Sequence, residues 1–164
     1  MAIVHSNPMA SPSASEAAVR SARALLAAEK VGVLSTISVH RAGFPYGSVT
    51  PYALSAQGAP VLLLSRLAAH TKNLLADPRA SLFVGDRSAA EDPQAGARVS
   101  LLGRMSPVPP ADEGDARTRY IGAWPRAVDY LALGDFSFWR LAIEEARLIA
   151  GFGEIRWLDG GALR

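Results

Sequence analysis

The sequence predicts an α+β domain that is mainly β, with a sheet that closes or nearly closes into a barrel. About six apolar stretches have the length of strands, and short turns separate most of them. The expected helices are short and do not alternate regularly with the strands, which argues against a parallel sheet. With 164 residues, of which 49% are hydrophobic, the chain can form one domain with a sizeable core.

The first half of the chain predicts one helix and then a group of strands. Ser15 and Glu16 can begin a helix that runs to about Lys30. The next three apolar segments are joined by short turns, which favours an antiparallel meander. These expected strands are residues 31–38, 46–54 and 61–65.

The second half predicts a mixture of strands and short helices. Pro78 ends a short helix, and Pro125 divides the helical region at 111–133 into two. A polar loop at 86–96 is expected to be mobile, and the glycines of Gly151-Phe152-Gly153 are interpreted as a bulge. The helix covers residues 71–77, and the expected strands are 80–85, 97–105, 136–143 and 147–158.

Composition excludes several classes of protein. A net charge of +2 without a block of like charges gives no footprint for nucleic acid. The absence of cysteine excludes disulfides, thiolate metal sites and cysteine nucleophiles. The apolar runs are too short to span a bilayer, so no membrane contact is expected.

Residues 1–14 are interpreted as a disordered leader rather than a signal peptide. One domain is expected at 15–164, and the protein is expected to be cytoplasmic.

The junction after the expected strand at 61–65 is the most informative segment. The strand ends at Ser65 and Arg66, and a helix begins near Thr71, Lys72 and Asn73. The start of a helix favours an anion, and Arg and Lys suit a phosphate group. A capped helix with solvated basic residues would use the same residue types, so both interpretations stay open.

Signatures of self-sufficient catalysis are missing from the sequence. There is no Walker loop, no HExxH and no nucleophile elbow. The histidines His5, His40 and His70 are not spaced as metal ligands, and we favour a capping or packing role for His70 over that of a general base. Asp135 is interpreted as a turn residue. No catalytic residue or metal site is assigned, and chemistry from a cofactor is the expectation.

Two segments resemble a known family. Residues 43–52 (GFPYGSVTPY) and 64–74 (LSRLAAHTKNL) resemble the FMN-binding split barrel of pyridoxamine 5'-phosphate oxidase-like proteins. Residues 134–141 (GDFSFWRL) and 149–153 (IAGFG) are similar to the branch of that family that includes haem-utilisation proteins. The likeness extends over about residues 17–158, with all motifs in order.

The resemblance implies a split β-barrel with flanking short helices, assembled as a homodimer with FMN at the subunit interface. It implies that Lys72 is the main cation at the phosphate and that Arg98 contacts the flavin from the partner subunit. The cofactor-binding residues implied by the resemblance are Ser48, Val49, Thr50, Ser65, Arg66, Leu67, Thr71, Lys72, Asn73 and Arg98.

For function, the resemblance implies an FMN-dependent oxidoreductase acting on a small molecule. The alternative is a non-catalytic flavin- or haem-binding protein for storage, sensing or haem utilisation; a deazaflavin ligand and a relative without cofactor also stay open.

The sequence departs from the family pattern at two places. The oxidases proper carry a C-terminal Trp and Arg motif for substrate phosphate, whereas this chain offers only Arg156-Trp157, in a different setting, which argues against that specific activity. No histidine follows His70, so the C-terminal haem ligand of the haem-degrading relatives is missing, although Asp135 matches an aspartate that they keep.

Overall fold

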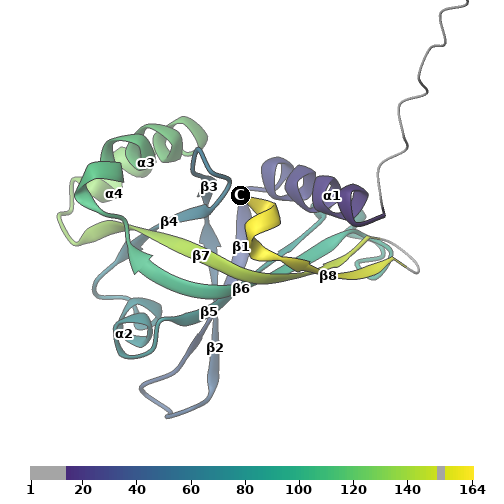
Figure 1. Ribbon diagram of the computed structural model, residues 1–164. Helices are drawn as coiled ribbons and strands as arrows, with labels where there is room; N and C mark the ends of the chain where they lie inside the picture. The colour runs from purple at the N-terminus through teal and green to yellow at the C-terminus, as the bar shows by residue number, and fades with distance from the viewer. Residues whose placement is uncertain (1–13, 151–153) are drawn as a thin grey trace, which may run out of the picture.

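The computed structural model describes residues 14–150 and 154–164, and Figure 1 shows a curved sheet with α1, α3 and α4 above it and α2 below it. The sheet has eight strands, and the prediction of a mainly β fold is confirmed. The strands are β1 (Val31–Ile37), β2 (Pro45–Pro51), β3 (Ala53–Leu54), β4 (Pro60–Ser65), β5 (Arg79–Gly85), β6 (Arg98–Pro107), β7 (Phe136–Ile149) and β8 (Ile155–Asp159). The helices are α1 (Ala14–Ala28), α2 (Ala69–Ala76), α3 (Pro110–Ala123) and α4 (Ala127–Leu131), with short 3₁₀ turns η1 (Arg87–Ala89) and η2 (Gly160–Leu163).

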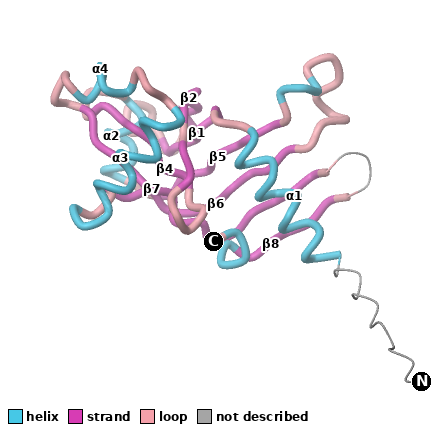
Figure 2. The backbone as a smooth tube through the Cα atoms, turned by 90° about the horizontal axis from the view of Figure 1, so that it is seen from above, coloured by secondary structure: helices cyan, strands magenta, loops and turns pink. Residues whose placement is uncertain are grey.

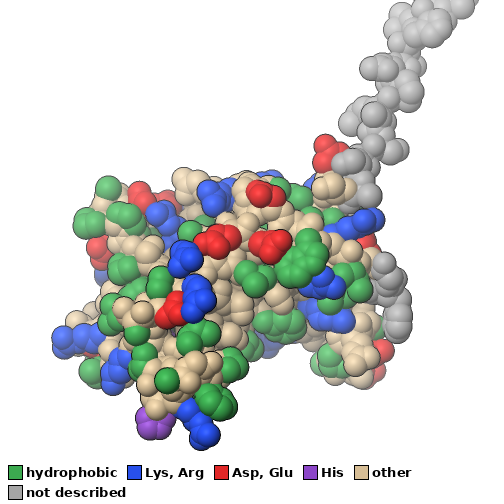
Figure 3. Space-filling view, turned by 60° about the horizontal axis from the view of Figure 1, so that its bottom comes forward, with side chains coloured by type: hydrophobic (Ala, Val, Ile, Leu, Met, Phe, Trp, Pro, Cys, Tyr) green, Lys and Arg blue, Asp and Glu red, His purple; other side chains and the backbone are tan. Residues whose placement is uncertain are grey.

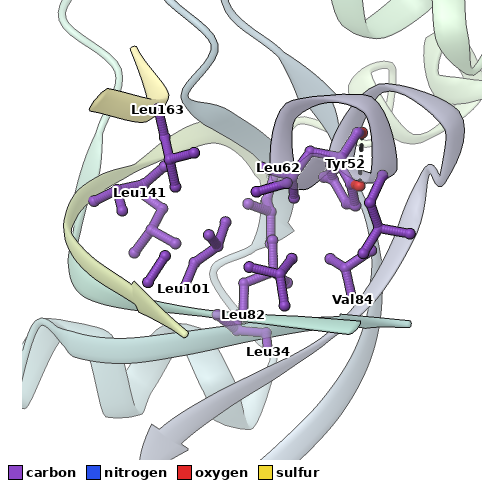
Figure 4. Close-up of a cluster of buried hydrophobic side chains, with 14 of the residues drawn as sticks. Leu34, Tyr52, Leu62, Leu82, Val84, Leu101, Leu141 and Leu163 are labelled. Carbon is purple, nitrogen blue, oxygen red and sulfur yellow. Dashed lines mark hydrogen bonds between the residues drawn. The ribbon is translucent and has the colours of Figure 1, made fainter. Parts of the chain in front are cut away.

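The strand expected at 46–54 is divided into β2 and β3 by Tyr52. Its backbone N–H donates to Lys30 O (2.9 Å), and its hydroxyl donates to Leu26 O (2.8 Å). The side chain is buried, and the hydroxyl bond to α1 is the dashed line in Figure 4. A buried phenol with a hydrogen-bonded hydroxyl fixes the corner at which the chain leaves β2.

This corner makes the predicted three-stranded meander wrong as a continuous unit. β1 and β2 form one hairpin and β3 and β4 another, but β4 pairs with β7 instead of β2. The order across the sheet is β2-β1-β5-β6-β7-β4-β3, with β8 on β7. Because β2 and β3 end this path and are consecutive in the chain, the sheet curves back on itself and forms a split barrel.

Strand β7 is also longer than predicted, because residues 144–146 continue it. The pairing with β6 shifts register between Leu102 and Gly103, where Leu102 is opposite Glu145 and Gly103 is opposite Ile143. A bulge of this kind places Glu144 and Glu145 both at the surface, and both side chains are exposed. Glu144 and Glu145 therefore lie at a bulge within one strand, whereas the sequence predicted a break between two strands there.

The main core fills the barrel. Inward-facing residues of six strands pack together beneath α1, and Leu34, Leu62, Leu82, Leu101 and Leu141 have almost no exposed surface. Figure 2 shows α1 lying across the strands, with the C-terminal η2 turn beside it. Ala18, Ala22 and Leu26 form the buried face of α1, as its helical spacing predicts.

A second, smaller core lies under α3 and α4. Tyr120 of α3 packs edge-on against Phe138 of β7, with ring centroids 5.6 Å apart. Trp124 donates from Nε1 to Tyr52 O (3.0 Å), which links this core to the β2–β3 corner. Trp139 is buried in the main core, whereas Trp157 on β8 is 53% exposed.

Two sequence predictions fall on residues outside the described ones, namely the leader (except Ala14) and the bulge at Gly151-Phe152-Gly153. Within residues 14–150 and 154–164, no helix combines the length and apolar character needed to cross a membrane.

Gly103 provides a test of the bulge. A Cβ at Gly103 would lie 2.0 Å from Ala142 O, so Gly103→Ala should lower the free energy of unfolding by about 1 to 3 kcal/mol or more. Gly114→Ala in α3 is the control, because its Cβ would meet no atom within 4 Å and should stabilise the helix by about 0.5 to 1 kcal/mol. Urea denaturation of both variants measures the difference. Equal stability of Gly103→Ala and the wild type would contradict the register described here.

Candidate functional site

The junction between β4 and α2 is attached to the start of β7. Ser65 donates from Oγ to the carboxylate of Asp135, and Arg66 N–H donates to Asp135 O (2.8 Å). Ser65 Oγ also accepts a hydrogen bond from Leu67 N–H (3.1 Å). These bonds fix the backbone at the junction while the side chains of Arg66 and Leu67 remain exposed. Asp135 is therefore a structural partner of the junction as well as a turn residue.

The first turn of α2 presents donors rather than a completed cap. Ala68 occupies the N-cap position, and no side chain caps the helix. Lys72 is exposed, whereas Thr71 is buried and its hydroxyl has no protein hydrogen-bond partner. The capped-helix interpretation required a side chain on the terminal amides, which is not observed. An open helix start with adjacent cations is suited to an anionic group.

Asn73 has a different environment from its neighbours in the sequence. Its Oδ1 accepts a hydrogen bond from Val39 N–H (2.9 Å), and its Nδ2 donates to Thr36 Oγ1 (2.9 Å). The side chain is 2% exposed. Asn73 thus holds α2 against β1 and the turn that follows it.

His70 is in the first turn of α2, and its side chain faces β2. Its side chain is half-buried, and Nδ1 is 3.3 Å from Ser48 Oγ. Burial lowers the pKa of the imidazole from its ordinary value, which favours the neutral ring near pH 7. The sequence left His70 outside the set of binding residues because a single histidine in a short helix has no distinctive spacing.

Consecutive residues of β2 face opposite sides of the sheet. Ser48 contacts His70 of α2 and Thr50 is buried on the same face of the strand, whereas Val49 faces outward and is 74% exposed. The hydroxyl of Thr50 is buried without a protein partner, as is that of Thr71; these are the two such side-chain atoms among the described residues. The three residues expected to line a cofactor therefore lie on two faces of one strand.

The outer face of the sheet carries an apolar row. Val49 is opposite Val33, Val33 is opposite Phe83, and all three are exposed. They line a hollow of about 290 Å³, together with Arg98 at its rim. Figure 3 turns the side of the sheet opposite α1 forward and shows hydrophobic side chains next to Lys and Arg.

Arg98 lies far from the β4–α2 junction within one chain. Arg98 is opposite Ile149 at the end of β7, and Ser65 is opposite Phe136 at its start. A straight strand between those two partners would span roughly 40 Å. Arg98 also donates from Nη1 to Gln94 O (2.8 Å) and Gly96 O (3.2 Å), which holds it beside the hollow.

Eight of the ten predicted binding residues form two groups, whereas Thr50 and Asn73 are buried and belong to neither. The junction group contains Ser65, Arg66, Leu67, Thr71 and Lys72, next to Ser48 of β2. The outer-face group contains Val49 and Arg98. Among residues 14–150 and 154–164, no cluster of three or more His, Asp or Glu side chains could hold a metal ion by itself.

Comparison with known proteins identifies the family. The family model described as "CREG, beta-barrel" matches residues 12–161. The chain is 37% identical over 135 residues to the chloroplastic heme oxygenase HOZ of Arabidopsis thaliana, across 81% of this chain and 40% of HOZ.

Solved structures agree with this result. A heme binding protein from Mycobacterium smegmatis superposes with a TM-score of 0.83 at 36% identity, over 93% of this chain and 60% of that one. A Clostridium acetobutylicum protein of the pyridoxinephosphate oxidase family has a TM-score of 0.68 at 11% identity, over 91% of this chain and 99% of that one. The last likeness concerns the fold alone, and it confirms the predicted split barrel. The chain spans less than two thirds of HOZ and of the mycobacterial protein.

The structural role of Asn73 can be tested. Asn73→Ala leaves the Val39 N–H and the Thr36 hydroxyl without their partner, so the free energy of unfolding should fall by about 1 to 3 kcal/mol. Leu75→Ala in the same helix is the control, because Leu75 is 69% exposed and its truncation should change stability little. Chemical denaturation compares the two variants. Similar losses in both would show that the amide bonds do not hold α2 in place.

Proposed function

This chain belongs to the CREG β-barrel family, and we propose that it binds haem in a site shared between two copies of itself. The observation that carries the proposal is the combination, on opposite faces of β2, of an uncapped helix start beside exposed cations with an exposed apolar surface. The identities of 36% and 37% with a heme binding protein and a heme oxygenase support haem as the ligand. Haem, when bound, supplies a redox-active iron.

The apolar body of haem fits the outer face of the sheet. Val33, Val49 and Phe83 expose carbon-rich side chains around the hollow beside Arg98. A volume of about 290 Å³ lies just below the usual range for ligand pockets, and the hollow is open on one side. A second surface is required to bury a large flat ligand there.

The propionate groups of haem fit the donors of the junction. Arg66 and Lys72 are exposed cations next to the open start of α2. The Thr71 hydroxyl in the same turn is buried without a protein partner. Carboxylates and phosphates are bound by the same set of donors, which is why the sequence pattern alone does not choose between haem and a flavin phosphate.

A second copy of the chain would supply the missing wall. Within one chain, Arg98 and the junction lie at opposite ends of β7. Pairing two copies through their outer faces would cover the exposed apolar row and bring Arg98 of one copy toward the junction of the other. This arrangement agrees with the homodimer that the resemblance implies.

FMN remains the second candidate, as the cofactor of an oxidoreductase that acts on a small molecule. The open helix start with Arg66, Thr71 and Lys72 favours it, because these donors suit a terminal phosphate equally well. The flavin would supply the redox chemistry, and the side chains of the junction would hold its phosphate.

Titration of the purified protein with hemin and with FMN distinguishes the two candidates. We expect hemin to give a saturable shift of the Soret band at one haem per chain, and FMN to bind more weakly. Saturable quenching of flavin fluorescence without a change in the hemin spectrum would reject the haem proposal and support the flavoenzyme.

Lys72 should contribute to either ligand. Lys72→Ala should weaken hemin binding by about 1 to 3 kcal/mol, because a charge-assisted hydrogen bond to a carboxylate is lost. Lys30→Ala is the matched control, since Lys30 is the other lysine of the chain and lies in the connection between α1 and β1. Equal affinities of the two variants would remove Lys72 from the site.

The outer face should determine assembly. Val49→Asp places a carboxylate in the apolar row and should convert a dimer into a monomer in sedimentation velocity experiments. Val128→Asp on α4 is the control, because Val128 is 45% exposed and is remote from the outer-face row. A Val49→Asp variant that still sediments as a dimer would place the interface elsewhere.

A further inference from the structure

The loop between β5 and β6 forms one wall of the hollow on the outer face of the sheet. Pro93 and Ala97 of this loop line the hollow, next to Arg98 at the start of β6. We propose that the loop positions the guanidinium of Arg98 to bind the anionic group of the ligand, a propionate in haem, and that Asp92 holds the loop in the required conformation. The inference rests on the proposed ligand site and deepens it.

Arg98 is on the same face of the sheet as the apolar row. Residues two apart in a strand face the same side, and Ser100, two residues after Arg98, is opposite Phe83. The residue opposite Arg98 itself is Gly85, which has no side chain. A Cβ on Gly85 would be 3.5 Å from the ring of Phe83, so the ring lies beside this glycine. The space over Gly85 is therefore bordered by an aromatic ring and by the base of the Arg98 side chain.

Two carbonyl groups of the loop hold one end of the guanidinium. Nη1 of Arg98 donates to Gln94 O (2.8 Å) and to Gly96 O (3.2 Å). Nη1 carries two hydrogens, so these two bonds can use both of them. Nη2 and Nε donate to no acceptor within residues 14–150 and 154–164. The edge formed by Nη2 and Nε can bind a carboxylate through two parallel hydrogen bonds.

Asp92 fixes the turn that presents these carbonyl groups. Its Oδ1 accepts hydrogen bonds from Gln94 N–H (3.1 Å) and from Ala95 N–H (3.4 Å). The backbone oxygen of Asp92 also accepts a hydrogen bond from Ala95 N–H (3.1 Å). Gln94, whose carbonyl holds Arg98, thus lies inside a turn that the Asp92 side chain closes.

The base of the loop is fixed separately from this turn. Asp86 N–H donates to Ala97 O (2.8 Å), and Arg87 N–H donates to the Glu29 carboxylate in the connection between α1 and β1 (3.1 Å). Figure 2 shows the loop, with its η1 turn, beyond the ends of β5 and β6. A change at Asp92 therefore affects the turn while the base of the loop keeps its own bonds.

An arginine that is held in place before the ligand arrives binds it more tightly. A long side chain loses rotational freedom when a ligand fixes it, and that loss opposes binding. The two loop carbonyls bring about part of this loss in the free protein. In the proposed dimer, Arg98 of one copy lies toward the junction of the other. It would therefore add a fixed cation to Lys72 of the other copy at the same propionate groups.

A double-mutant cycle in hemin binding tests the inference. Arg98→Ala should weaken hemin binding about tenfold, because charge-assisted hydrogen bonds are lost. Asp92→Ala should weaken it about two- to tenfold, because the arginine must then be ordered when hemin binds. In the Arg98→Ala background, Asp92→Ala should have no further effect. The affinities are measured by titration of the Soret band. Arg98→Lys keeps the charge without the planar fork, and it replaces Arg98→Ala if that variant does not fold.

Two further variants are the controls. Asp92→Asn keeps an oxygen that can accept the hydrogen bonds of the turn, so it should bind hemin as the wild type does. Glu91→Ala removes a negative charge from the same loop and leaves the Asp92 bonds in place, so it should also match the wild type. Circular dichroism checks that each variant is folded.

The outcomes separate the inference from the proposed function. If the wild type binds neither hemin nor FMN, the proposed function fails and the inference fails with it. If it binds FMN alone, the same cycle is measured by flavin fluorescence. If the ligand binds and Asp92→Ala weakens it equally with and without Arg98, the ligand site stands and the inference is overturned. Wild-type affinity of Asp92→Ala or of Arg98→Ala, or an equal loss in Glu91→Ala, overturns it as well.

Discussion

The alternation of side chains along β2 is the constraint on which the proposed site depends. Because successive residues of a strand face opposite sides, Ser48 must contact α2 when Val49 faces outward. The register with β1 is continuous from Val31 to Ile37, so this choice of faces extends through the whole hairpin. A shift of one residue would bury Val49 and separate Ser48 from His70. The polar and the apolar halves of the site are therefore set by a single pairing register.

Much of the fold could be predicted from local patterns, because each element carries its own signal. The helical spacing of α1, the alternation in β6 and the prolines after it are visible in the sequence. The order of the strands depends on long-range contacts that local patterns do not encode. The corner at Tyr52 needs a backbone bond to Lys30 and a hydroxyl bond to Leu26, and neither residue is a turn signal. The bulge at Gly103 likewise appears only when β6 and β7 are paired.

The sequence predicted which residues belong to the candidate site, and the structure adds that most of them lie in a junction group and an outer-face group. Arg66 and Lys72 were identifiable because basic residues beside a helix start have a direct physical meaning. The burial of Asn73, the isolation of the Thr50 and Thr71 hydroxyls and the contact of His70 with Ser48 depend on packing between α2 and β2. The hydrogen bond from Ser65 to Asp135 joins residues that are 70 positions apart, and sequence spacing does not indicate it.

The choice between haem and flavin depends on the part of each ligand that is not anionic, namely the iron of haem and the ring of the flavin. Propionates and a phosphate make the same demand on Arg66, Lys72 and the helix start, so the junction by itself is a general anion site. Iron adds a demand for an unprotonated nitrogen, whereas the flavin ring is bound by hydrogen bonds and apolar contact. The contact between His70 Nδ1 and Ser48 Oγ packs α2 against β2 whichever of the two groups is bound.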